Sequence, residues 1–352
     1  MQDHMRPDDV VKYIDYGVIV TAGGLAVLAA FGAIYAWPWS KFAPKQGGST
    51  EYNSIWGVRV CLQMTAFFWL LSPLLQRHEA WGQKVDVLEQ LDVSGSVPCE
   101  LYLSARLGLF EPFFLFLGLL AFRHSLRQGE GWEVLNDTEM GETKAREEYV
   151  NRKIIGSALL HTLPIFGLQT LIAVLTVVVS ADMERKWGFP KYFLISSVVE
   201  KEGCDIGKEG ELPSSGCVVC IYPLISTMVS ALFILYYLWR MWQITSQMMF
   251  ITLNQSLKQR IVMFRLAVTL LLSLGVLCRG LTVIPMPRSQ PFEFLRLGDF
   301  VSVALFVVAS SYFLVVRPVR DTRFADKTAG MMIALTTRFS SRRLRVRRRS
   351  PS

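Results

Sequence analysis

Among the polar and ionisable side chains that lie inside long apolar runs of this chain, five are candidates for a functional site. Four of them carry charge, and one is a histidine; they are Arg106, Glu111, Arg279, Asp299 and His161. A charge at the centre of a membrane-spanning helix costs about 2.5–3.5 kcal/mol, so such a group faces a protein interior or a wet cavity. The charged set can bind a small polar or anionic ligand, or it can form buried ion pairs that fix helix register. The histidine either joins this set or packs through a hydrogen bond.

The positions of these residues within their runs indicate which of them can meet. Arg106, Arg279 and Asp299 fall in the same half of the predicted bundle, with Glu111 beneath them. Glu111 immediately precedes Pro112, which removes a backbone donor, so we expect a kink there. Arg106 and Glu111 are five residues apart, about 140° around an α-helix, and are not expected to pair directly.

The overall composition favours a membrane setting. Of 352 residues, 51% are hydrophobic and 19% are charged, against roughly 25% charged in ordinary soluble domains. A helix needs about 20 apolar residues to cross a hydrocarbon core about 30 Å thick. Seven stretches qualify, so we predict an all-α, polytopic, multi-pass integral membrane protein. The stretches are 17–39, 56–75, 101–122, 154–179, 217–239, 261–284 and 296–316.

The distribution of basic residues predicts the orientation. Loops and tail on one side hold 22 of the 37 Lys and Arg residues; they are 40–55, 123–153, 240–260 and 317–352. The other side holds 10, in 1–16, 76–100, 180–216 and 285–295. Because Lys and Arg accumulate in the cytoplasm, the N-terminus is predicted outside and the C-terminus inside. The regions are then an outer segment 1–16, a transmembrane domain 17–316 and a basic cytoplasmic tail 317–352. Which membrane the chain occupies is not indicated.

Four cysteines fall on the predicted outer, oxidising side. They are Cys99, Cys204, Cys217 and Cys220. They can form disulfides, with three pairings available, or Cys220 can pack in the fifth helix while Cys99 stays a free thiol. A zinc site would need a second CxxC pair beside Cys217–Cys220, so no metal site is predicted.

The tail is the part of the sequence that most clearly indicates a binding partner. Seven arginines follow a helically spaced apolar face; they are Arg338, Arg342, Arg343, Arg345, Arg347, Arg348 and Arg349. Such a pattern is typical of an interfacial helix with a polybasic patch that binds anionic lipids, each charge worth about 1 kcal/mol. It could instead be a solvated topology anchor or recruit a cytoplasmic protein. A tail tethered to a membrane is not expected to bind nucleic acid.

The arrangement of helices and cysteines resembles heptahelical receptors of the G-protein-coupled kind. Cys99 stands at the outer end of the third predicted helix, and further cysteines follow in the next long outer loop. In that family a disulfide joins these two places, which implies a bond from Cys99 to Cys204 or Cys217. The stretches 203–207 and 220–227 are also similar to a group of plant and algal seven-helix proteins, and that resemblance implies a fold.

These observations leave three classes of function. No catalytic motif such as HExxH, G-x-x-x-x-G-K-[ST] or GxSxG is found, so no catalytic residue or cofactor is predicted. The chain also lacks the acidic-Arg-aromatic, Cys-Trp-x-Pro and Asn-Pro-x-x-Tyr motifs of signalling receptors. We expect a receptor-like protein with a polar cluster in its outer half that can take a small polar ligand. The alternatives are a transporter or channel for a small polar solute, and a scaffold that recruits partners through its tail.

Overall fold

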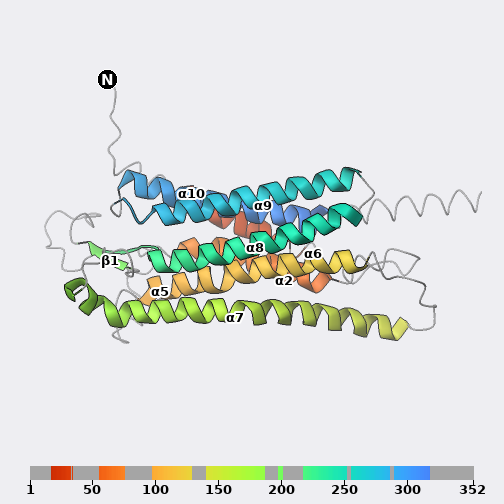
Figure 1. Ribbon diagram of the computed structural model, residues 1–352, viewed down its shortest axis with the longest axis horizontal. Helices are drawn as coiled ribbons and strands as arrows, with labels where there is room; N and C mark the ends of the chain where they lie inside the picture. Colours follow the sequence, from red (N-terminus) through yellow and green to blue (C-terminus); the bar gives the residue numbers. More distant parts are fainter. Residues whose placement is uncertain are drawn as a thin grey trace, which may run out of the picture.

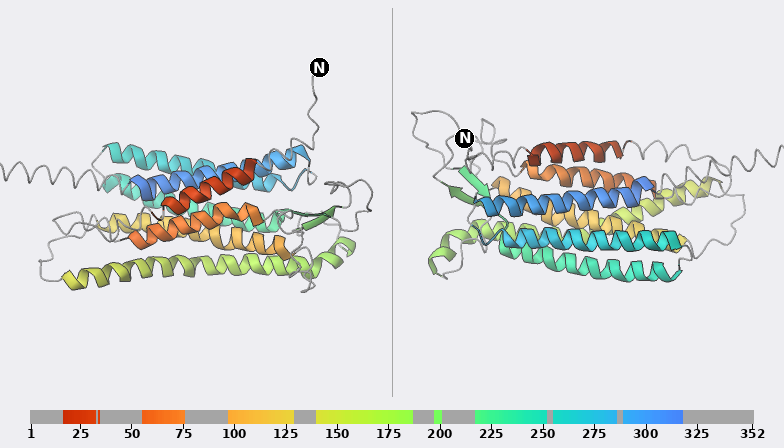
Figure 2. Two further views of the ribbon diagram at one scale, coloured as in Figure 1. Left: turned by 180° about the vertical axis from the view of Figure 1, so that it is seen from behind. Right: turned by 90° about the horizontal axis from the view of Figure 1, so that it is seen from above.

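The chain forms a bundle of helices that lie side by side along one long axis, with a short strand pair beyond one end (Figure 1; Figure 2). This computed structural model describes residues 17–32, 34, 55–75, 97–128, 140–186, 197–200, 217–251, 255–285 and 289–317. Consecutive helices from α6 to α10 alternate in direction (Figure 1). The predicted outer segment 1–16 lies outside the described residues, as does the predicted tail 317–352 apart from residue 317.

The elements follow one another in a simple order. They are the helix Gly17–Gly32, α2 (Trp56–Leu75), α5 (Val97–Leu103), η2 (Ser104–Phe110), α6 (Glu111–Gln128), α7 (Met140–Lys186), β1 (Ser197–Glu200), β2 (Cys217–Cys220), α8 (Leu224–Ile251), α9 (Gln255–Leu281), α10 (Gln290–Ser311) and η4 (Tyr312–Val316). Over the described residues the fold is all-α, apart from the two-stranded ladder of β1 and β2.

Every apolar stretch predicted from the sequence contains helix where the structure describes it. Among the described residues, five helical runs are long and apolar enough to cross a membrane; they are Cys99–His124, Glu148–Leu175, Leu224–Phe250, Lys258–Leu281 and Gln290–Val316. The first predicted stretch appears as a shorter apolar helix, Gly17–Gly32, and the second is α2.

Large apolar side chains cover the outward faces of α7, α8 and α9. Examples are Leu160, Leu163, Leu171, Leu232, Leu235, Leu266, Leu270 and Leu277, each more than half exposed. A soluble monomer does not carry apolar surface on this scale, because water would penalise it. Hydrocarbon around the bundle removes the penalty, since lipid tails are as apolar as leucine.

Helix α7 is far longer than a bilayer requires. Its 47 residues extend about 70 Å at 1.5 Å per residue, against a hydrocarbon core of about 30 Å. Helix α7 begins at Met140, so it includes the second half of the loop 123–153. On this part of the helix Arg152 Nη2 lies 2.7 Å from Glu148 Oε1, an ion pair at i,i+4 spacing.

The predicted start of the fifth helix was wrong by seven residues. Residues 217–220 form β2, which pairs antiparallel with β1 so that Ser197 faces Cys220 and Glu200 faces Cys217. The helix begins only at Leu224, after Pro223. Proline lacks a backbone N–H and fits the first turn but not a helix interior, while two adjacent valines suit an extended strand.

Aromatic side chains and glycine contacts hold the middle of the bundle together. Trp69 of α2 packs on Phe114 of α6 at 5.4 Å and on Phe306 of α10 at 6.1 Å between ring centroids. At Gly108 a Cβ would lie 3.0 Å from the backbone of Phe166, so a larger residue at this position of η2 would push against α7. This close contact fixes the depth of η2 in the bundle.

Candidate functional site

A wide helical turn just before Glu111 sets the geometry of the polar cluster. Residues Ser104–Phe110 form the π-helical segment η2, and the Glu111 N–H donates to the carbonyl of Arg106, five residues back. Pro112 cannot donate to the preceding turn, so a wider turn replaces the regular α-helical pattern. The expected kink therefore takes the form of a π-turn. Because a π-turn closes after about five residues instead of four, Arg106 and Glu111 both face the bundle interior.

Arg279 is the centre of the cluster. Its Nη1 lies 3.1 Å from Glu111 Oε2 and its Nη2 lies 3.1 Å from Asp299 Oδ1. The same Nη1 donates to Ser230 Oγ at 3.1 Å, and Ser230 Oγ donates to Glu111 Oε1 at 3.4 Å. One guanidinium thus joins α9 to α6, α8 and α10.

Arg106 extends the cluster toward the strand pair. Its Nη2 lies 2.7 Å from Asp299 Oδ2, and its Nη1 donates to the hydroxyls of Tyr222, at 2.7 Å, and of Tyr102. The guanidinium also lies over both rings, with Cζ 5.8 Å from the Tyr102 centroid and 5.7 Å from that of Tyr222. Arg279 lies over the Tyr222 ring as well, at 5.6 Å.

The four charged groups form a chain of alternating sign: Arg106, Asp299, Arg279, Glu111. Each of the four residues is between 1% and 3% exposed, so these ion pairs are shielded from bulk water. With two positive and two negative groups, these four residues together carry no net charge. We call these four residues the charge network. The sequence predicted that Arg106, Arg279 and Asp299 meet with Glu111 beneath them, and the structure brings all four into contact.

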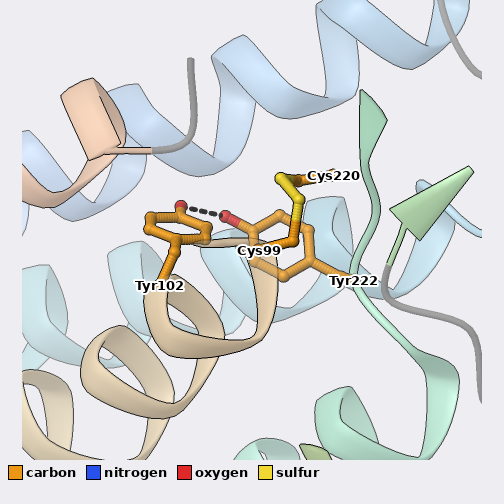
Figure 3. The surroundings of a disulfide bond; sticks show 4 residues. All are labelled: Cys99, Tyr102, Cys220 and Tyr222. Atoms are coloured by element: carbon orange, nitrogen blue, oxygen red, sulfur yellow. Dashed lines mark hydrogen bonds between the residues drawn. A yellow bond between two sulfur atoms is a disulfide. The ribbon is translucent and has the colours of Figure 1, made fainter. Parts of the chain in front are cut away.

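A disulfide lies next to the tyrosine end of the charge network. It joins Cys99 to Cys220, whose Cα atoms are 5.4 Å apart. Cys99 lies one turn before Tyr102, and Cys220 two residues before Tyr222; the two tyrosine hydroxyls are 2.9 Å apart and face each other beside the bond (Figure 3). The disulfide therefore ties together the two backbone segments that supply the tyrosines.

The cysteine pairing corrects two expectations. The resemblance to receptors implied Cys204 or Cys217 as the partner of Cys99, but the partner is Cys220. The alternative in which Cys220 packs in a helix and Cys99 stays free is wrong as well, because Cys220 ends a strand. Cys204 lies outside the described residues.

His161 is not part of the charge network. It lies on an exposed face of α7, where its Nδ1 is 2.6 Å from the carbonyl of Ser157 and its ring packs 5.3 Å from that of Phe116. Within a helix this is a local side-chain to backbone contact. The assignment of His161 to a buried polar cluster was wrong, and the packing alternative describes it.

Three participants were missed from the sequence: Tyr102, Tyr222 and Ser230. Neutral polar residues are common on apolar helices and do not stand out as charges do. A signal was present for Tyr102, which precedes Arg106 by four residues and so shares its helix face. Tyr222 stands between Cys220 and Pro223, where its position could be inferred only once the disulfide was known.

In each arginine of the charge network one guanidinium nitrogen, Nε, makes no hydrogen bond to the described residues. The Nε atoms of Arg106 and Arg279 are buried and have no partner among the described residues. A guanidinium carries five N–H donors, and a buried donor without an acceptor costs free energy. Within the described part of the chain no group of three His, Cys, Asp or Glu residues is placed to hold a metal ion. The arrangement suits a molecule that offers acceptor oxygens or nitrogens.

Sequence comparison places this chain within a family. No curated protein matches the chain. Residues 19–329 match one family model, and this range includes the disulfide and the whole charge network. The chain therefore belongs to the family described as "Uncharacterised conserved protein UCP031277".

Proposed function

We propose that this chain is a seven-helix, receptor-like membrane protein whose charge network responds to a small polar ligand. The observation that carries the proposal is the pair of buried, unused Nε donors on Arg106 and Arg279. A ligand with acceptor atoms would satisfy both donors. The network is already neutral, so a polar uncharged or zwitterionic molecule fits it better than an anion, which would add an uncompensated charge.

The way the helices are joined supports a conformational response. Asp299 of α10 and Arg279 of α9 reach Arg106 and Glu111, which belong to η2 and α6. Buried ion pairs stabilise a fold little better than apolar packing of the same volume, but they have discrete partners that can be exchanged. A ligand that takes up some guanidinium donors would weaken the hold of α9 and α10 on η2 and α6. Discrete repacking of this kind is how helical bundles change state.

A ligand screen with an arginine variant tests this proposal. The purified full chain in phosphatidylcholine nanodiscs is heated with amino acids, nucleosides, monosaccharides or small dicarboxylates, and its Tm is recorded. We expect at least one zwitterionic or neutral polar compound to raise the Tm of the parent and of Arg152→Gln, a surface control, but not of Arg279→Gln. A compound that raises the Tm of all three binds elsewhere. Flux of such a compound into liposomes would favour the transporter instead.

A second prediction concerns the topology in the membrane: seven spans, with the N-terminus outside and the C-terminus in the cytoplasm. We expect a tag at the N-terminus to be reached by antibody on intact cells and a tag at the C-terminus only after permeabilisation, because 22 loop and tail bases lie on one side against 10 on the other. The disulfide would then lie on the oxidising side, where such bonds persist. An externally accessible C-terminus would overturn this topology.

A further inference from the structure

The hairpin of α8 and α9 has an unusual distribution of charge. From Leu212 to Phe292 the sequence contains no Asp or Glu. Toward the ends of α8 and α9 that are remote from the disulfide, the same stretch contains four bases: Arg240, Lys258, Arg260 and Arg265. This end of the hairpin therefore has no acid of its own to neutralise it.

Two of these bases are held against tryptophan rings. The Cζ of Arg265 lies 3.0 Å from the centroid of the Trp242 ring, and its Nη1 is 3.5 Å from Ser246 Oγ. The Cζ of Arg240 lies 5.9 Å from the ring of Trp239. An arginine stacked on an aromatic face keeps the edge of its guanidinium free for a phosphate or carboxylate. Contact across the two helices therefore fixes the position of Arg265 before any partner binds.

The two arginines lie at matching depths. Each is sixteen residues from the disulfide end of its helix, Arg240 from Leu224 and Arg265 from Leu281. That distance is about 24 Å along the axis, which places both near the far side of a hydrocarbon core about 30 Å thick. Tryptophan side chains prefer this boundary layer, where lipid phosphates lie.

An apolar stripe leads from this end of α8 toward the membrane centre. Leu232, Leu235, Trp239 and Trp242 recur at helical spacing and are 66%, 63%, 57% and 49% exposed. On α9, Leu266 follows Arg265 and is 52% exposed. A lipid whose headgroup reaches the arginines would lay its acyl chains along these side chains.

Among the described residues, no Asp or Glu forms an ion pair with Arg240 or Arg265. Glu148 of α7 is bound by Arg152 of its own helix, with both side chains well exposed. Arg240 Nη1 donates to the neutral Gln243 Oε1 at 2.8 Å, leaving its positive charge in place. The cationic surface formed by Arg240 and Arg265 with Trp239 and Trp242 is thus complementary to an anionic phosphodiester.

We propose that this surface binds the headgroup of an anionic phospholipid. It lies on the lipid-facing side of α8 and α9 and is separate from the charge network, so the proposal does not depend on a ligand there. Arg265 stacked on Trp242 would bind the phosphate, and Arg240 would add the second charge. The lipid would join α8 and α9 at the end opposite the disulfide.

Native mass spectrometry of the full chain in detergent tests the site with defined lipids. Phosphatidylglycerol and phosphatidylcholine are titrated against the parent, the double variant Arg240→Gln/Arg265→Gln, and the control Arg152→Gln. At about 1 kcal/mol per charge, the double variant should bind phosphatidylglycerol about 30-fold more weakly, with phosphatidylcholine binding unchanged. The control should match the parent, and the tail contributes equally to all three.

A single variant and a competition with inorganic phosphate complete the experiment. If the double variant does not fold, judged by its Tm, the single Arg240→Gln variant removes one charge from a partly exposed position and should lose about fivefold. Inorganic phosphate at millimolar concentration should not displace phosphatidylglycerol, since it lacks acyl chains. Equal phosphatidylglycerol binding by parent and variant, or displacement by free phosphate, would overturn the proposal.

Discussion

Replacing Arg279 by glutamine is expected to destabilise the protein by about 3–5 kcal/mol. Arg279 is the only described side chain that contacts both Glu111 and Asp299. Its loss leaves Glu111 buried with Ser230 alone and Asp299 with Arg106. Uncompensated charge in a low-dielectric interior carries this penalty because neither water nor a counter-ion can reach it. The Tm and the free energy of unfolding of the full chain, measured in one detergent, report the loss.

A double-variant cycle shows whether the loss comes from the pair. Glu111→Gln alone leaves Arg279 with Asp299 and should destabilise by a smaller amount, because one ion pair remains. The double variant Glu111→Gln/Arg279→Gln removes both charges and should recover part of the loss of Arg279→Gln. Arg152→Gln serves as the control and should have little effect, since its ion pair is on the surface. Strictly additive losses would show that Glu111 and Arg279 are not coupled.

Removing the disulfide is expected to cost about 2–5 kcal/mol of stability. The bond closes a long loop, because Cys99 and Cys220 have a sequence separation of 121. Cross-links that close long loops restrict the unfolded chain most. The variant Cys99→Ser/Cys220→Ser should therefore lose Tm, and each single variant should lose about as much. Reductant should lower the Tm of the parent but not of the double variant.

The disulfide variant also tests how the tyrosines are held. Cys61→Ser is the matched control, because Cys61 is a free, partly buried cysteine; its Tm should be close to that of the parent. Near-ultraviolet circular dichroism should change in the Cys99→Ser/Cys220→Ser variant, since Tyr102 and Tyr222 would no longer be fixed beside each other. Parent-like stability with both thiols alkylatable would contradict a structural role for the bond.

The sequence predicted the elements and the charged residues well, for a physical reason. Long apolar runs have few alternatives to helix in lipid, where every backbone group must be paired. Arg106, Glu111, Arg279 and Asp299 could be grouped because the cost of exposing them to lipid forces them inward. The same argument fails for His161, because an imidazole can form a hydrogen bond with a backbone carbonyl of its own helix and remain on the outer face.

The contacts within the site required the structure. Which cysteine meets Cys99 depends on the register of β1 with β2, and nothing in the spacing of Cys204, Cys217 and Cys220 specifies that register. The π-turn was not predicted either. Pro112 indicated a local departure from α-helix, but a kink and a wide turn both follow from one missing N–H. The tail and the N-terminal segment stay predictions.

The wide turn η2 lets the continuous helix formed by α5, η2 and α6 contact two different parts of the bundle. A π-turn accommodates one more residue than an α-turn, so the residues before and after it are rotated by about 100° relative to an uninterrupted helix. Cys99 and Tyr102 on one side are thereby directed to the segment around Tyr222, and Glu111 on the other to Arg279. Deleting a single residue between Ser104 and Phe110 would let the turn close as a regular α-helix. Either the disulfide or the Glu111 ion pair would then lose its partner, so the length of this segment is as strongly constrained as the identity of its charged residues.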